Sequence, residues 1–212
     1  MHFKVKLQDA NYHEFAMNGY PTNFWHGDWF ASKGIGVCQI RLNANRNHQR
    51  KLPKFFDIHL YVSHYHANYD PSNDIYLGHR VIHAFESAQW IKLTSSAADL
   101  TIYAGDFNTE PSSLPYRILR NVAPLNDSWE CCAKYRTSDS PQSTREGYTN
   151  EVTSNSFSNI SPSRNSEELD SEINVCGKRI DYIMYRSLKS SYLLVFKDMN
   201  KTTFYKFRFF LY

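Results

Sequence analysis

The chain has 212 residues and a formal net charge of +3, with 42% hydrophobic and 16% aromatic residues. This apolar content excludes disorder over most of the chain, because its burial offsets the entropy lost on folding. The charge is too small for a concentrated basic surface, so we expect no nucleic-acid partner. The sequence has no secretory signal and no apolar run of the ~18 residues that a membrane-spanning helix needs, which favours a cytoplasmic chain.

Glycine and proline punctuate residues 18–36 and predict turns and loops there. Two strands are then expected, over residues 35–42 and 56–64. Apolar residues recur at every second position from Ile58, which places His64 on the same apolar side where the second strand ends.

An amphipathic helix is predicted next, ending near residues 94–96. Asn73 and Asp74 are good helix caps before it. Its apolar residues recur at steps of three and four and are expected to form one buried face: Leu77, Val81, Phe85, Ala88 and Ile91.

Strands and helices continue to alternate after this helix. We expect a strand over 100–104 that stops at Gly105, a helix over 112–122 with Pro115 in its first turn, and a strand over 181–185. This alternation indicates a layered α/β domain.

The last part of the chain has a different composition. Residues 134–175 are rich in Ser, Asn, Thr and Glu without an apolar period, which predicts a long surface loop. Two further strands are expected in the tail, over residues 191–196 and 203–212.

The strongest chemical signal is Asp106 with Asn108, at the end of an apolar strand. Residues two apart on an extended segment point the same way, so the carboxylate can activate water while the amide donates to a phosphate oxygen. A simple turn, where Gly, Asp and Asn are favoured, is the alternative interpretation.

Two further strand ends carry candidate groups. His64, with His66 close by, can donate to a phosphate oxygen or relay a proton, although a lone His is more often structural. Asp181 lies between apolar residues of its strand and either orients a catalytic His or forms a salt bridge with Lys178 or Arg179.

The glycine-rich first third holds the last candidates. Asp28 and Lys33 lie five positions apart in this segment. They either contact a charged substrate or form an ordinary surface ion pair.

The order of these motifs resembles the neutral sphingomyelinases of the endonuclease/exonuclease/phosphatase superfamily. The most specific stretches are His-Gly-Asp-Trp-Phe at 26–30 and the stretch at 74–80. The remaining matched motifs are Asn18–Pro21, Lys33-Gly34, His64 with His66-Ala67, Gly105–Asn108, Asp127–Trp129 and Arg179–Tyr182.

The resemblance implies a four-layered α/β/β/α sandwich and Mg²⁺-dependent hydrolysis of sphingomyelin to ceramide and phosphocholine. His64 would contact the phosphate, Asp106 would activate water, Asn108 would hold the phosphoryl group and Asp181 would orient a catalytic His. Asp28 and Lys33 would form the Asp/Lys pair of a mobile loop that gates substrate entry. The resemblance also implies a phospholipid partner at a membrane surface and a membrane-associated intracellular protein.

The chain also departs from the pattern. The Glu that binds Mg²⁺ in the family would lie before residue 1, so we expect no metal ligand in this chain, and the closing Ser-Asp-His segment is missing. We therefore expect a partial domain over 1–186, incomplete at its N- and C-terminal strands, with an insertion at 134–175 and an unmatched tail at 187–212. Removing one member of a catalytic unit removes most of its rate, so weak or no activity is expected.

Two alternative functions remain open at this point. The same fold can hydrolyse a nucleic acid or a phosphoinositide. The chain can also be a non-catalytic protein that binds a lipid or a partner through its aromatic-rich loops.

Overall fold

A computed structural model describes residues 6–43, 55–70, 72–131, 147–150 and 178–187. The strands are β1 (Lys6–Glu14), β2 (Gly34–Asn43), β3 (Phe55–His64), β4 (Leu100–Asp106), β5 (Asn126–Asp127) and β6 (Asp181–Ser187). The helices are α1 (Leu77–Thr94) and α2 (Leu114–Val122), with short 3₁₀ turns η1 (Pro21–His26) and η2 (Asp28–Phe30). The predicted α/β class is confirmed.

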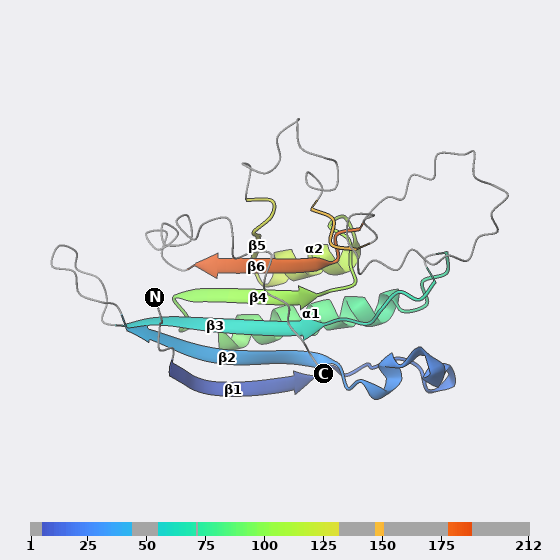
Figure 1. The fold of residues 1–212 in the computed structure, drawn as a ribbon, viewed down its shortest axis with the longest axis horizontal. Coiled ribbons are helices and arrows are strands. Elements are labelled where there is room, and N and C mark those ends of the chain that lie inside the picture. The colour runs from blue at the N-terminus through green and yellow to red at the C-terminus, as the bar shows by residue number, and fades with distance from the viewer. Residues whose placement is uncertain (1–5, 44–54, 71, 132–146, 151–177, 188–212) are drawn as a thin grey trace.

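The six strands form one mixed sheet in the order β1-β2-β3-β4-β6-β5. Strands β3 and β4 are parallel and are connected through α1, as parallel neighbours require a crossover, whereas the other pairs are antiparallel. Both helices lie behind the sheet in Figure 1. The described residues thus form one sheet layer and one helix layer.

The core lies between the sheet and the two helices. On β3 the buried side chains are His59, Tyr61 and Ser63, so the apolar side that begins at Ile58 and includes His64 faces the other way and is less buried. The Tyr61 ring is buried, and its hydroxyl is hydrogen-bonded to Thr94 Oγ1 at 2.7 Å. Because the hydroxyl has this partner, Tyr61 can occupy a core position.

Helix α1 also buries an unexpected face. Leu77 and Phe85 are exposed, while polar residues of the helix are buried beside Ala84, Ala88 and Ile91: His79, Arg80, His83 and Ser87. Two of these side chains have partners on other segments: Met17 O lies 2.7 Å from His83 Nε2, and the Tyr103 hydroxyl donates to Ser87 Oγ at 3.0 Å. The buried face of α1 hydrogen-bonds to the chain at Met17, so it is more polar than periodicity alone predicts.

The ends of both helices were predicted closely. Helix α1 begins at Leu77, but neither Asn73 nor Asp74 caps it with a side chain; Asp74 instead pairs with Arg80. Pro115 lies in the first turn of α2, as expected.

Strand β1 and the two 3₁₀ turns were not predicted. Most of the β1 side chains are exposed, and the strand is held by its antiparallel pairing with β2. Most of the predicted loop at 134–175 and the strands predicted at 191–196 and 203–212 lie outside the described residues. Within the described part of the chain, no helix is long and apolar enough to cross a membrane.

Candidate active site

Three predicted site residues form one row at an edge of the sheet. His64 ends β3 and is paired in register with Asp106, which ends β4; Asp106 is in turn paired with Asp181, which begins β6. His64 Nε2 lies 3.8 Å from Asp106 Oδ2. Because β6 runs antiparallel to β4, its first residue meets the last residue of β4, as the neighbouring arrows in Figure 1 show.

A glycine allows the strands to approach beside this row. Gly105 has φ +154°, and a Cβ atom there would lie 1.8 Å from the carbonyl oxygen of Ser63 on β3. Any side chain at this position would push β3 and β4 apart where His64 meets Asp106.

Asn108 is fixed directly after β4. Its backbone has φ +45°, a left-handed conformation that Asn tolerates better than most residues. Its backbone N–H donates to Asp106 Oδ1 at 2.9 Å, and its side-chain Nδ2 donates to Tyr65 O at 3.0 Å. The alternative of a simple turn is half right, since the turn itself orients the Asp106 carboxylate.

Asp28 and Lys33 form an ion pair with 3.0 Å between Lys33 Nζ and Asp28 Oδ1, in which Lys33 is buried and Asp28 is partly buried. Asp28 Oδ2 accepts the Ala67 N–H at 2.9 Å, and Lys33 Nζ donates to Tyr65 O at 2.9 Å. The ordinary surface ion pair considered from the sequence is therefore wrong. Since Tyr65 O accepts from both Lys33 and Asn108, the pair borders the strand-end row.

The strand-end groups have shifted pKa values. Burial raises the pKa of Asp106, and burial together with the negative charge of Asp106 raises the pKa of Asp181 to about 6. Burial and the nearby Lys33 ammonium lower the pKa of His64. His64 is therefore neutral near pH 7, and Asp181 titrates just below neutrality.

The Asp28–Lys33 pair has its own shifts. Burial acts to raise the pKa of Asp28, but the Ala67 amide and the Lys33 ammonium outweigh it and lower this pKa. Burial lowers the pKa of Lys33, against the attraction of Asp28.

Arg179 does not pair with Asp181. Its Nη1 lies 2.6 Å from Asp127 Oδ2, and both side chains are buried. Asp127 also accepts from the Tyr116 hydroxyl and from the Trp129 N–H, each at 2.9 Å. The alternative of an Asp181–Arg179 salt bridge is wrong, and the 127–129 motif has a structural use.

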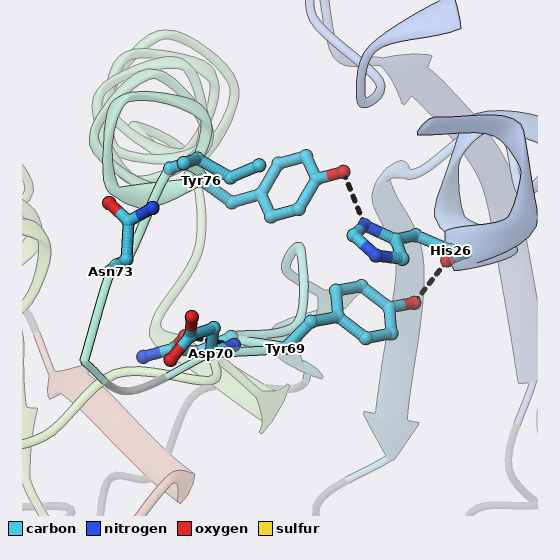
Figure 2. Close-up of a pocket in the computed structure, with 7 residues that line it drawn as sticks. His26, Tyr69, Asp70, Asn73 and Tyr76 are labelled. Atoms are coloured by element: carbon cyan, nitrogen blue, oxygen red, sulfur yellow. Dashed lines mark hydrogen bonds between the residues drawn. The ribbon is translucent and has the colours of Figure 1, made fainter. Parts of the chain in front are cut away.

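A cavity of about 220 Å³ lies beside the Asp28 segment and was not predicted. Its walls are His26, Asn68, Tyr69, Asp70, Asn73, Ile75 and Tyr76. Figure 2 shows the hydroxyls of Tyr69 and Tyr76 both bonded to His26, one to its carbonyl and one to its ring. The signal in the sequence was the aromatic and polar run that follows His64, which periodicity does not single out.

Comparison with known proteins identifies the family. The sequence model of the Endonuclease/Exonuclease/phosphatase family matches residues 11–196. Human sphingomyelin phosphodiesterase 2 is 32% identical over 192 residues, which cover 90% of this chain and 39% of that protein. Inositol phosphosphingolipids phospholipase C of Schizosaccharomyces pombe is 30% identical over 129 residues, covering 61% of this chain and 28% of that protein.

A solved structure supports the same fold. Sphingomyelinase C from Streptomyces griseocarneus superposes with a TM-score of 0.51 at 16% identity, covering 86% of this chain and 50% of that chain. This chain spans well under half the length of the two curated relatives above. The family match over most of the sequence makes the chain a member of the endonuclease/exonuclease/phosphatase family.

Proposed function

We propose that this protein hydrolyses the phosphodiester of a sphingomyelin-type phospholipid to ceramide and phosphocholine. The observation that carries the proposal is the row of His64, Asp106 and Asp181 beside the Asp28–Lys33 pair. The names of the curated relatives, a sphingomyelin phosphodiesterase and an inositol phosphosphingolipid phospholipase, support the lipid class.

In the proposed reaction, water adds to phosphorus while the bond from phosphorus to the ceramide oxygen breaks. Asp106 accepts the proton of the attacking water; its raised pKa makes it a better base than an ordinary carboxylate. The ceramide oxygen takes a proton from solvent as it leaves, which gives a neutral alcohol, and Asp106 returns its proton to solvent, so that the net reaction consumes one water molecule.

Two side chains would bind the phosphoryl oxygens. His64 is partly accessible beside Asp106 and can donate a ring N–H. The Asn108 amide carries two N–H groups, of which one bonds to Tyr65 O, so the other can donate to the phosphoryl group.

Asp28 and Lys33 would hold the stretch of chain between them next to the row of His64, Asp106 and Asp181. In the proposed gate, the closed pair holds Lys33 against Tyr65 O, and opening would release its ammonium toward an anionic substrate. The electrostatic effect of Lys33 on both Asp106 and His64 supports this placement.

The described residues support only a limited role for Mg²⁺. Burial and the charge of Asp106 raise the pKa of Asp181, and a divalent cation would relieve this crowding of carboxylates. However, no three His, Cys, Asp or Glu side chains among the described residues are placed to hold a metal ion. These residues alone do not make a metal site, and no step above passes through one.

Release of phosphocholine from sphingomyelin, measured with Mg²⁺ present, tests the proposal. Asp106→Asn should lose about 10²–10⁴-fold in turnover, as expected for removal of a general base. Asp57→Asn is the matched control, because Asp57 lies at the opposite end of β3 and pairs with Arg41.

A panel of inositol phosphoceramide, a phosphoinositide and DNA separates the alternatives. Turnover of DNA or the phosphoinositide without turnover of any sphingolipid would overturn the proposed substrate. If the unchanged chain turns over sphingomyelin, equal turnover by Asp106→Asn would overturn the proposed role of Asp106; if the unchanged chain turns over none, the proposed function is overturned.

A further inference from the structure

Four large aromatic side chains are exposed within seven residues of η1 and η2. Their exposed fractions are 56% for Phe24, 66% for Trp25, 39% for Trp29 and 71% for Phe30. Single exposed apolar residues are ordinary, but a group of this kind marks a surface that contacts another apolar phase. Residues 24–30 form the aromatic segment.

The aromatic segment is held in place by polar contacts on its inner side. His26 Nδ1 lies 2.7 Å from the Tyr76 hydroxyl, and Asp28 Oδ2 accepts the Ala67 N–H at 2.9 Å. Tyr76 is buried and stacks on His66 with 3.8 Å between ring centroids. The rings are therefore displayed by an anchored segment.

Charge does not oppose insertion of this segment into an apolar phase. Its one carboxylate, Asp28, is already paired with Lys33 and hydrogen-bonded to Ala67. Transfer of the exposed rings out of water thus leaves no bare charge to desolvate.

Aromatic contacts also connect the segment to the cavity. Phe24 lies 5.1 Å from Trp25 and Trp25 lies 5.9 Å from His26, measured between ring centroids. His26 then stacks on Tyr69 at 4.4 Å, at the wall of the cavity in Figure 2. A lipid at the segment would therefore lie next to the Asp28–Lys33 pair.

We propose that the aromatic segment docks on the surface of a phospholipid bilayer. Trp, with an apolar body and one N–H donor, suits the boundary between head groups and acyl chains, where the Phe rings can insert. The inference rests on the proposed function for its choice of a lipid surface over a protein partner. Docking through residues adjacent to Asp28 places the strand-end row at the membrane.

Vesicle binding tests the docking surface without relying on catalysis. The variant Trp25→Ala with Phe30→Ala should bind phosphatidylcholine vesicles about 100-fold or more weakly in a sedimentation assay, since two large apolar side chains no longer insert. Leu93→Ala is the matched control: Leu93 is 73% exposed at the end of α1 and should have no effect. Thermal melts establish that both variants fold, and Phe30→Ser alone provides a milder second variant.

Turnover on two substrate forms separates docking from catalysis. The double variant should lose turnover of sphingomyelin in vesicles but keep turnover of a soluble short-chain analogue. If the unchanged chain turned over neither substrate form but the double variant still lost vesicle binding, docking would be supported and the proposed function overturned. Unchanged vesicle binding by the double variant, or an equal loss in Leu93→Ala, would overturn docking.

Discussion

Two ion pairs with a buried cation, Asp127–Arg179 and Asp28–Lys33, consist of similar groups but lie in different surroundings. Asp127 binds Arg179 at 2.6 Å and also accepts from Tyr116 and Trp129, all within the part of the chain next to β5 and β6. The partner of Asp127 is the Arg179 guanidinium. Burial acts to lower the pKa of Arg179, but the charge of Asp127 outweighs burial and raises this pKa overall. Arg179 therefore keeps its charge, and the pair connects β5 to the residues just before β6.

The Asp28–Lys33 pair instead joins a surface segment to the candidate site. Lys33 can lose its proton more easily than an ordinary Lys, because burial lowers its pKa. Asp28 connects the aromatic segment to Ala67, close after His64. An ion pair whose Arg keeps its charge supports structure, whereas an ion pair whose Lys can lose its proton can support a moving part.

The largest expected effect comes from breaking the structural pair. Asp127→Ala leaves the buried Arg179 charge without its main partner and should lower the free energy of unfolding by about 3–5 kcal/mol. Urea denaturation followed by circular dichroism measures this loss. Asp57→Ala, which breaks a solvent-accessible ion pair with Arg41, should have little effect, and equal losses in both variants would contradict the comparison.

A smaller effect is expected at the adjustable pair. Asp28→Asn and Lys33→Met should each cost less than Asp127→Ala, because an unpaired Lys33 can become neutral. A double-mutant cycle in urea should give a coupling of about 0.5–3 kcal/mol for residues in contact. Additive losses would show that the two side chains do not interact in solution.

The smallest expected effect concerns Asp181, for which the described residues provide no Lys or Arg ion pair. Its folded pKa of about 6 lies above the ordinary Asp value of 3.8, so its contribution to stability is fully present below pH 3.8 and is lost as pH rises through 6. Asp181→Asn should therefore melt above the unchanged chain at pH 7.5, and the difference should shrink toward pH 4.

A control of opposite sign sharpens this pH experiment. The hydrogen bond and charge of Arg41 lower the pKa of Asp57, so Asp57 contributes stability that is present above its unfolded pKa and is lost as pH falls. Asp57→Asn should melt slightly below the unchanged chain at pH 7.5, since its ion pair with Arg41 is solvent-accessible. If both variants moved in the same direction, the assigned shifts would be wrong.

Sequence patterns located the strand ends that carry the candidate residues better than they located the buried face of α1. His64, Asp106 and Asp181 each lie at the end of a recognisable strand, so local pattern was enough to select them. Their common row could not be predicted, because it depends on strand order and register between segments far apart in the chain.

The misassigned core has a physical reason. Periodicity counts Leu77 and Phe85 as buried because they are apolar, whereas α1 buries His83 and Ser87, whose polar atoms find partners on other segments. Such partners are tertiary contacts and leave no local pattern. The cavity beside Tyr69 was missed for the same reason.

The pairing of Asp106 with Asp181 joins positions 75 residues apart in the sequence. Closing a chain segment costs entropy that grows only with the logarithm of its length, about 0.6 kcal/mol for each doubling. The stretch between Asp127 and Asp181 can therefore lengthen or shorten substantially at small cost. Register with β4 still fixes where Asp181 lies, so the length of this stretch can vary without moving the carboxylate.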